Sequence, residues 1–407
     1  MNEGFHFDLA HRCKSLRPTK FNIRSALKCE MKIGIDARTL SRPLTGIGRY
    51  TYEMCLGMAR LGGSNDFCLF SPSPLLEENR VGLDGFHLRH HNWQSPLGRQ
   101  FWIESWLPKW AVNEEVDVFW GPAHRLPRLL PKSVPRVVTI HDLVYKLAGD
   151  TMRPFARLLE AFQVPSAVHN ADVIVTDSQA TAAAIRTEFG NTGSRVVVIP
   201  AGSRKKRNDA ANLRTGTPIP DVPFLLFVGT CEPRKNITRL LKAYAGLPKA
   251  TKERAALVMA GGKGWGGINL PKIIGQLKLG SHVHMMGYVE ETVLDVLYTR
   301  AMFLAMPSLY EGFGLPIVEA QAYGLPVLAG NNSSMPEVTG DAGILVDATN
   351  VCSIQHGLEK MIMDDEFRID LASRARTNAA RFDWDSSARQ LMDVMEIAIQ
   401  IRQGVVS

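Results

Sequence analysis

The sequence has no apolar run approaching the ~18 residues that a helix needs to cross a bilayer, and no hydrophobic region typical of a signal peptide. Its six cysteines are scattered, with no Cys-x-x-Cys pair and no dense framework. This spacing does not favour disulfides or a structural zinc site and is typical of proteins in a reducing compartment. We therefore expect a cytoplasmic protein.

The signature of a nucleic-acid-binding module is also missing, because the cationic residues are dispersed and no aromatic-interleaved repeat accompanies them. The formal net charge is +7, and residues 1–30, with six Lys/Arg and three Asp/Glu, carry +3 of it. A basic balance indicates anionic partners, such as a pyrophosphate or an anionic lipid surface. Residues 1–30 lack clear periodicity, so they are either a disordered basic arm or a segment ahead of a true start at Met31.

A chain of 407 residues is too long for one ordinary core, and 45% hydrophobic and 21% charged residues are typical of globular proteins. Short β-branched runs alternate with helical patterns, which predicts parallel sheets of strand–helix–strand units. In the first half we expect strands at Lys32–Ile35, Asp117–Trp120, Arg136–Ile140, Val173–Thr176 and Arg195–Ile199. In the second half we expect strands at Phe224–Val228, Ala256–Ala260, Val283–Met285, Met302–Met306 and Val327–Leu328.

The stretch from Gly202 to Pro223 separates these two series of strands. It is rich in glycine, proline and basic or polar residues and has almost no bulky apolar residue, as in an interdomain linker. The last segment, Asp385 to Arg402, is one long helical pattern. The pattern predicts an α/β protein of two Rossmann-like domains facing a central cleft, with function in the loops beyond the carboxyl ends of the strands.

The run from Tyr310 to Glu319 follows a buried strand and predicts a glycine-rich loop that opens a helix. Its two carboxylates, Glu311 and Glu319, lie eight residues apart, one on the loop and one in the helix. Carboxylates accept pairs of hydroxyl hydrogen bonds, and glycines expose backbone N–H groups beside a positive helix N-terminus. The combination suits a ligand with hydroxyls and phosphates; a capped helix with surface glutamates is the alternative.

A second loop, from Gly229 to Asn236, follows another strand, and Asn236 is expected to cap the next helix. The adjacent Arg234 and Lys235 make a compact site of two positive charges. Fixed cations stabilise the negative charge that develops on a pyrophosphate leaving group as its bond breaks. A pair of solvated surface cations is the alternative.

Two further loops lie at strand ends in the first half. Gly46 and Gly48 precede a helix that we expect to begin near Tyr50, but Thr51 replaces the third glycine of the dinucleotide fingerprint. These glycines permit close approach of a ligand, and a flexible turn is an equal alternative. His141 follows a strand and either hydrogen-bonds a sugar hydroxyl or reacting oxygen, or caps the strand structurally.

Patterns typical of metal sites are present but incomplete. His282 and His284 share a strand face without a third ligand nearby. Asp383 and Asp385 match an Asp-x-Asp pattern, but they stand before the last helix, where a helix cap is expected. We therefore expect no bound metal.

Together these motifs resemble the retaining glycosyltransferases of family 4, which share the two-domain GT-B fold. The resemblance covers the chain from Met31 to about residue 400. It rests on Glu311 and Glu319 with the intervening Gly-Phe-Gly-Leu-Pro, on Gly229 with Arg234-Lys235-Asn236, on Gly287-Tyr288-Val289, and on Ser334-Met335-Pro336-Glu337. Any one motif is weak alone, and the ordered set is specific.

The resemblance implies that Glu311 contacts hydroxyls of the donor sugar, that Glu319 contacts the ribose, and that Arg234 and Lys235 neutralise the diphosphate. His141 matches the family's active-site histidine near the sugar. The other implied donor contacts are Gly229, the backbone groups of Phe313, Gly314 and Leu315, Gly287 and Tyr288 beside the nucleobase, and Gly46 and Gly48 facing the donor phosphate or the acceptor.

The family generally needs no divalent metal, so the resemblance implies no cofactor beyond the nucleotide-sugar co-substrate, with the cation pair in place of a metal. Retention is usually pictured as attack on the face that the leaving group departs from, with the leaving phosphate oxygen taking the acceptor's proton. Neither Glu311 nor Glu319 is therefore expected to act as a glycosidase-like nucleophile.

The implied organisation is a basic extension (1–30), a Rossmann-like acceptor domain (31–203), a linker (204–222), a Rossmann-like nucleotide-sugar-binding domain (223–383) and a terminal helix (384–407) that crosses back to the first domain. The opening Met31–Leu40, with Gly46–Tyr50, is similar to bacterial mannosyltransferases of polysaccharide assembly. It implies transfer of mannose from GDP-mannose onto a lipid-linked oligosaccharide of lipopolysaccharide or exopolysaccharide. It also implies peripheral contact with the cytoplasmic face of an anionic inner membrane.

Two alternatives remain open. A sugar-nucleotide epimerase on the same fold would use the same nucleotide contacts but convert a donor without an acceptor. A non-catalytic nucleotide-sugar-binding protein would bind without turnover and tolerate changes at His141 and Glu311. The sequence specifies neither the acceptor and its linkage nor the oligomeric state.

Overall fold

The computed structural model describes residues 30–93, 95–190, 193–204 and 219–405. The predicted basic arm, up to residue 29, and most of the predicted linker (205–218) lie outside the described residues. The fold described below is that of the unit that begins at Met31.

The first half of this unit, here called the first lobe, is built on a seven-stranded sheet in which all strands are parallel, in the order β3-β2-β1-β4-β5-β6-β7. The strands are β1 (Lys32–Asp36), β2 (Asp66–Ser71), β3 (His87–His90), β4 (Val118–Gly121), β5 (Arg136–Thr139), β6 (Val173–Thr176) and β7 (Arg195–Val198). The five predicted strands are confirmed. The sequence reading missed β2 and β3, and β3 is a polar, partly exposed edge strand without the apolar run of a buried strand.

The second half, here called the second lobe, is built on a six-stranded parallel sheet in the order β10-β9-β8-β11-β12-β13. The strands are β8 (Phe224–Val228), β9 (Ala256–Ala260), β10 (Val283–Gly287), β11 (Phe303–Met306), β12 (Val327–Gly330) and β13 (Gly343–Val346). The predicted strands of this half are confirmed, and β13 at the edge is an addition. The α/β prediction of two Rossmann-like sheets is thus correct.

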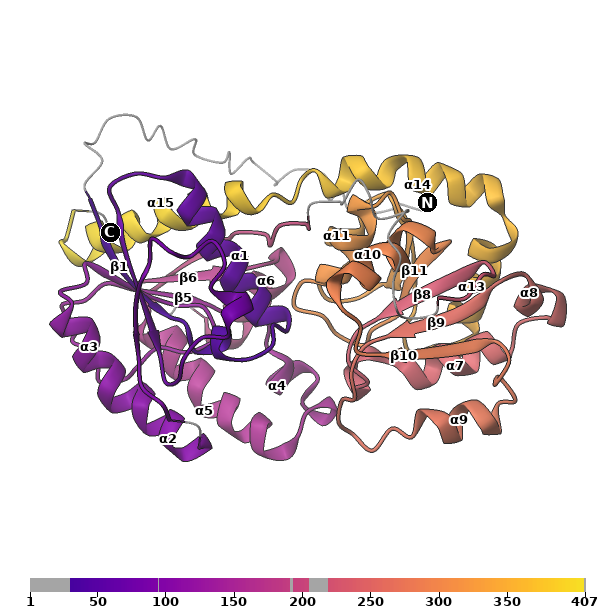
Figure 1. Ribbon diagram of the computed structural model, residues 1–407, viewed down its shortest axis with the longest axis horizontal. Helices are drawn as coiled ribbons and strands as arrows, with labels where there is room; N and C mark the ends of the chain where they lie inside the picture. Colours follow the sequence, from indigo (N-terminus) through magenta and orange to yellow (C-terminus); the bar gives the residue numbers. More distant parts are fainter. Residues whose placement is uncertain (1–29, 94, 191–192, 205–218, 406–407) are drawn as a thin grey trace, which may run out of the picture. The chain divides into compact units, whose positions relative to one another are not determined.

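The helices of the first lobe are α1 (Gly46–Leu61), α2 (Pro96–Phe101), α3 (Leu107–Asn113), α4 (Val144–Leu147), α5 (Pro154–Asn170) and α6 (Gln179–Phe189), and a π-helical stretch (Trp102–Trp106) joins α2 to α3. They cover both faces of the sheet (Figure 1). Both faces are covered because successive residues of a buried strand point to opposite faces of the sheet, and each face is apolar. Val118 and Trp120 lie in the same core as residues of α1, whereas Phe119 lies in the core with residues of α3 and α5.

The helices of the second lobe are α7 (Ile237–Ala245), α8 (Lys249–Arg254), α9 (Leu270–Gln276), α10 (Glu291–Arg300), α11 (Leu315–Ala322), α12 (Met335–Thr339), α13 (Val351–Met363) and α14 (Asp365–Ala379). Residues of α7, α9 and α13 share one core with the sheet, and residues of α10, α11 and α12 share another. Within the described part of the chain, no helix combines the length and the apolar character required to span a membrane.

The last helix, α15 (Trp384–Arg402), follows the second lobe but packs on the first. A Cβ at Gly57 of α1 would lie 2.6 Å from Cβ of Ala388, so the two helices meet where a side chain is absent. Ser387 donates a hydrogen bond to the Pro200 carbonyl at 2.6 Å. The predicted cap at Asp383 is confirmed, since its carboxylate accepts from the Ser386 N–H at 2.8 Å.

Candidate active site

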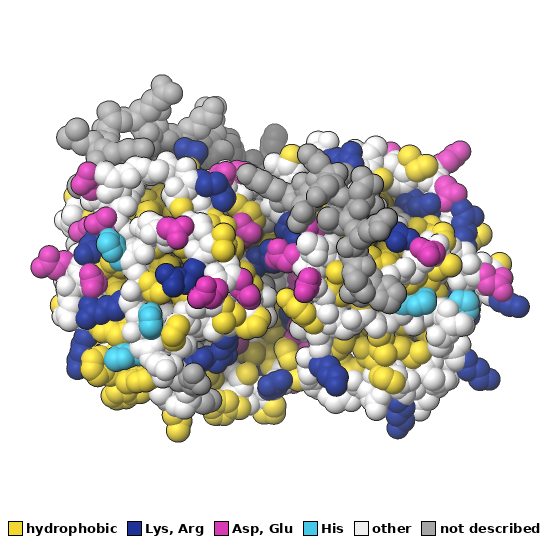
Figure 2. Space-filling view, viewed as in Figure 1, with side chains coloured by type: hydrophobic (Ala, Val, Ile, Leu, Met, Phe, Trp, Pro, Cys, Tyr) yellow, Lys and Arg dark blue, Asp and Glu magenta, His cyan; other side chains and the backbone are white. Residues whose placement is uncertain are grey.

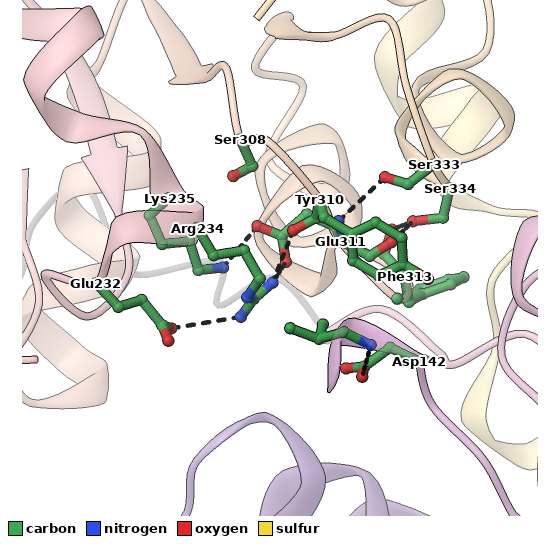
Figure 3. Close-up of polar contacts among 12 residues, drawn as sticks. Asp142, Glu232, Arg234, Lys235, Ser308, Tyr310, Glu311, Phe313, Ser333 and Ser334 are labelled. Carbon is green, nitrogen blue, oxygen red and sulfur yellow. Dashed lines mark hydrogen bonds and ion pairs between the residues drawn. The ribbon is translucent and has the colours of Figure 1, made fainter. Parts of the chain in front are cut away.

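The carboxyl ends of β8 and β11 bring Arg234, Lys235 and Glu311 together. An Nη atom of Arg234 lies 2.6 Å from one carboxylate oxygen of Glu311, and Nζ of Lys235 lies 2.8 Å from the other. Figure 3 shows both cationic side chains converging on this carboxylate. All three side chains are at least four-fifths buried. Residues 76 and 77 positions apart in the chain therefore form one charged cluster.

The cluster is not the free pair of positive charges predicted from the sequence. Each cation already faces Glu311, and Glu232 lies 3.3 Å from the Arg234 guanidinium on its other side (Figure 3). Two cations thus meet two carboxylates. The sequence reading missed Glu232, although it stands in the same short loop. Burial raises the pKa of Glu311, but the charges of Arg234 and Lys235 outweigh burial and hold this pKa at about 2.

The loop after β8 is fixed by its own polar contacts. Arg234 and Lys235 lie on a single 3₁₀ turn, Pro233–Lys235, which ends at Asn236 with a left-handed φ of 59°. The predicted side-chain cap by Asn236 is wrong. Its amide instead donates to the carbonyls of Pro307 and Ala348, at 2.9 and 2.6 Å, and so ties this loop to the end of β11.

The loop that carries Glu311 is anchored by two serines that follow β12. The Glu311 N–H donates to Oγ of Ser333 at 3.0 Å, and Oγ of the fully buried Ser334 lies 3.0 and 2.8 Å from the carbonyls of Glu311 and Phe313. The loop ends at Gly314, whose φ of 102° starts α11. Leu315, the first residue of α11, thus lies at a helix N-terminus, which favours anions.

Glu319 lies inside α11, as predicted, and is 6% exposed. One of its carboxylate oxygens accepts a hydrogen bond from the hydroxyl of Tyr298 on α10 at 2.9 Å. Burial and the neighbouring Glu319 charge raise the pKa of Tyr298 well above its usual value, which keeps the hydroxyl a donor. The sequence reading had no signal for Tyr298.

Other predicted donor contacts lie at the ends of β8 and β10. Gly229 has a φ of 151°, and a Cβ at Gly261 would lie 1.9 Å from the Gly229 carbonyl oxygen, so these two backbone segments pass unusually close. Gly287 ends β10 with a φ of 68°. Tyr288 follows it with 74% of its surface exposed, so its ring is open to stacking by a planar ligand.

His141 lies two residues beyond β5 and is buried. Its Nδ1 lies 2.6 Å from a carboxylate oxygen of Asp177, and its Nε2 lies 2.8 Å from the Pro122 carbonyl. Both ring nitrogens thus face oxygen acceptors. Burial lowers the pKa of His141, but the Asp177 charge and the two hydrogen bonds raise it above its usual value overall. The sequence reading missed Asp177, although Asp177 follows β6 just as His141 follows the adjacent β5.

The His141–Asp177 pair predicts a pH-dependent contribution to stability. Because the pKa of His141 is raised on folding, its contribution is complete below the unfolded value of about 6.5 and is lost as pH rises through the folded value. We expect the stability gap between the wild type and His141→Gln, measured by urea unfolding, to narrow from pH 6 to pH 9. A constant gap for His141→Gln would contradict the assigned charge.

The glycines near residue 46 lie within a helix rather than before one. α1 begins at Gly46, not near Tyr50 as predicted, and Gly48 is in its first turn. The first turn of a helix leaves its N–H groups without intrahelical partners. The 16-residue α1 therefore presents backbone donors and a positive helix end where the sequence predicted either close approach of a ligand or a flexible turn.

The loops that carry His141 and Glu311 meet at Gly312. A Cβ at Gly312 would lie 2.2 Å from the His141 carbonyl oxygen, and Oγ of Ser178 donates to the Gly312 carbonyl at 2.7 Å. A second contact between the lobes lies close by. The Glu337 carboxylate accepts from the N–H groups of Gln179 and Ala180 at the start of α6, at 3.1 and 3.2 Å.

One group of side chains in the described residues has the spacing of metal ligands. Ligand atoms of His124, Asp142 and Glu160 all lie within 4.8 Å of one another. Nε2 of His124, however, accepts from the His141 N–H at 3.1 Å, and burial lowers the pKa of His124 to about 4. The neutral ring therefore carries its proton on Nδ1 and has no free nitrogen for a metal. The hydrogen bond from His141 thus favours a structural role for His124 over metal binding.

Comparisons with known proteins identify the family of this chain. Residues 44–204 match the family described as Glycosyltransferase Family 4, and residues 209–378 match Glycosyl transferases group 1. The chain is 29% identical over 392 residues to an O-antigen chain mannosyltransferase B of Escherichia coli, with 90% of this chain and 100% of that protein covered. It is 32% identical over 278 residues to a D-inositol 3-phosphate glycosyltransferase of Nocardioides sp., with 63% of this chain and 60% of that protein covered.

Among solved structures, Anabaena HepE in complex with UDP-glucose matches with a TM-score of 0.68 at 18% identity, covering 90% of this chain and 100% of that one. The two parallel-sheet lobes define a GT-B glycosyltransferase fold. The chain belongs to the family 4 glycosyltransferases.

Proposed function

We propose that this glycosyltransferase moves mannose from GDP-mannose, with retention, onto a lipid-linked oligosaccharide in cell-surface polysaccharide assembly. The observation that carries the proposal is the buried cluster of Arg234, Lys235 and Glu311, which offers cations for a diphosphate and a charged carboxylate for sugar hydroxyls. The donor and acceptor are supported by the relative that matches over its whole length, whose name gives O-antigen mannosyl transfer.

In the proposed reaction, an acceptor hydroxyl attacks the anomeric carbon on the face from which the diphosphate departs. The bond between that carbon and the phosphate oxygen breaks, and the departing oxygen takes the hydroxyl proton. Negative charge then grows on the diphosphate. Arg234 and Lys235 are fixed in advance by Glu311, so they stabilise this charge without reorganising.

Glu311 and Glu319 hold the two ends of the proposed donor. Glu311 stays ionised at neutral pH because its pKa is about 2, so it accepts hydrogen bonds from sugar hydroxyls. Glu319 has the same capacity toward the ribose, with the Tyr298 hydroxyl fixing its carboxylate. His141 is engaged by Asp177 and the Pro122 carbonyl, and we propose that it positions the sugar as a cation.

The proposed function is tested by incubating the protein separately with GDP-mannose, UDP-glucose, UDP-N-acetylglucosamine and GDP-fucose, with EDTA present, and following slow donor hydrolysis by NMR. We expect release of α-mannose from GDP-mannose, with no loss on adding EDTA, because the cation pair replaces a metal. Strict metal dependence would contradict metal-independent transfer, and His124, Asp142 and Glu160 would then be tested as metal ligands.

The same panel separates the alternatives. Selective use of another donor would replace mannose in the proposal but leave the site assignments intact. Isomerisation of a donor without hydrolysis would favour an epimerase. Transfer to added inositol 3-phosphate would favour the acceptor named for the Nocardioides relative over a lipid-linked glycan.

A further inference from the structure

Helix α5 has an apolar outer face that no described part of the protein covers. Val164, Ala167 and Val168 on its inner side are buried in the core of the first lobe. Phe155, Leu158 and Phe162 on its outer side are 77%, 56% and 71% exposed. Their spacing of three and four residues places them on one helix face. α5 is therefore apolar on two sides.

Exposed apolar side chains are concentrated in this part of the chain. Of the fifteen large hydrophobic residues exposed in the described residues, eight lie between positions 97 and 162, and they include every exposed phenylalanine. They are Leu97, Phe101, Val112, Leu129, Leu147, Phe155, Leu158 and Phe162. The π-helical stretch that follows α2 packs on the same face of the sheet as α3 and α5. Hydrophobic side chains gather along the lower edge of the left half in Figure 2, where Figure 1 places α2 and α5.

A cavity of about 360 Å³ adjoins this face, between α4, α5 and α6. Its wall includes Lys146 and Arg157 together with Ala161 and Pro165 of α5. Lys146 lies 3.1 Å from Glu188, and Arg157 lies 3.2 Å from the almost fully exposed Asp150. Exposed Leu147 follows Lys146 directly, so an apolar and a cationic side chain are neighbours in the chain beside the cavity.

The charge around the apolar face is mainly positive. On α2 to α3, the loop 127–133 and the stretch 144–170, the only exposed acid in the described residues is Asp150. The exposed cations on the same segments are Lys109, Arg128, Lys132, Lys146, Arg153 and Arg157. A second copy would bring this positive surface against itself, because a two-fold interface pairs the same patch on both subunits. An anionic surface is complementary to it.

We propose that the outer face of α5, with Leu147 and the surrounding Lys and Arg side chains, docks this protein onto an anionic lipid bilayer. Aromatic and leucine side chains enter the boundary between headgroups and acyl chains, while the surrounding Lys and Arg side chains meet lipid phosphates. This inference rests on the proposed lipid-linked acceptor, and it adds the surface by which the enzyme reaches that acceptor.

The test is flotation of the full-length protein with vesicles of phosphatidylcholine alone or with 30% phosphatidylglycerol, at low and high salt. We expect binding only to the anionic vesicles, weakening as salt rises. The triple variant Phe155→Ser/Leu158→Ser/Phe162→Ser should bind at least about tenfold more weakly. A matched control, Val81→Ser/Ile369→Ser, removes equally exposed apolar side chains elsewhere and should bind as the wild type does.

Equal binding by the triple variant and the wild type, or equal binding to both vesicle types, would overturn the proposal. So would the absence of vesicle binding together with a dimer that the triple substitution dissociates in light scattering. Donor hydrolysis without acceptor is measured on every variant and should not change, because α5 carries none of the assigned donor contacts. A triple variant that loses vesicle binding but keeps normal donor hydrolysis shows that the substitutions affect docking and not the reaction. Failure of hydrolysis in the wild type would count against the proposed function alone.

Discussion

Replacement of Lys235 by alanine is expected to slow transfer by about 10²–10³-fold, the effect of removing one fixed electrostatic donor from a developing negative charge. Nζ of Lys235 lies 2.8 Å from Glu311 and is 9% exposed, so water cannot replace the lost charge efficiently. Arg234→Ala should have an effect of similar size. Most of the loss should appear in kcat, because the diphosphate gains charge only as its bond to the sugar breaks.

The measurement is initial rate of transfer, or of slow donor hydrolysis, over a range of donor concentrations. The matched control is Lys242→Ala, which removes an exposed cation from the helix that follows the same loop and should leave the rate unchanged. If both Arg234→Ala and Lys235→Ala turn over near normally, the assignment of these cations to the diphosphate is wrong.

The second large effect is expected for Glu311→Gln, which keeps the shape of the side chain and removes its charge. Two cations would then lose their shared buried partner, and breaking a buried ion pair costs about 3–5 kcal/mol of unfolding free energy. Because the pKa of Glu311 is lowered to about 2, its stabilisation is complete above about 4.5, the unfolded value, and is lost as pH falls through the folded value. The stability gap should therefore close between pH 5 and pH 2.

Glu311→Gln should also weaken recognition of the sugar more than affinity for the bare nucleotide diphosphate. Titration calorimetry with the nucleotide and with the nucleotide sugar separates the two effects, and retained nucleotide binding shows that the variant is folded. Glu290→Gln, which changes an exposed glutamate before α10, is the control. Equal loss of affinity for both ligands would contradict a sugar contact at Glu311.

Much of the fold could be predicted because buried parallel strands are continuous apolar runs, as in β8 and β9. β3 could not be predicted, because an edge strand of charged and polar residues has no such run. The start of α1 was misjudged for a related reason. Gly46 and Gly48 have low helix propensity, yet tertiary packing of Tyr50 and Met54 holds their turn in helical form.

The sequence indicated which residues belong to the candidate site, but not which of them contact one another. Motif order located Glu311, Arg234 and Lys235, but pairing between positions far apart in sequence decides that one carboxylate neutralises both cations. Asn236 was predicted to cap a helix because asparagine is common at that position, but its amide donates to two carbonyls that are distant in sequence. The exposed phenylalanines of α5 gave no signal, because a helix that is apolar on two sides has little periodicity to detect.

The packing of α15 on α1 has a consequence for recombination between related enzymes. The first lobe is covered by a helix encoded after the second lobe, in which Ser387 hydrogen-bonds Pro200 and Arg402 pairs with Asp172. A chimaera that joins two parents once, between the lobes, would therefore set one parent's α15 against the other's α1 and Gly57. Exchange of specificity between such enzymes calls for two junctions, so that the final nineteen-residue helix travels with the first lobe.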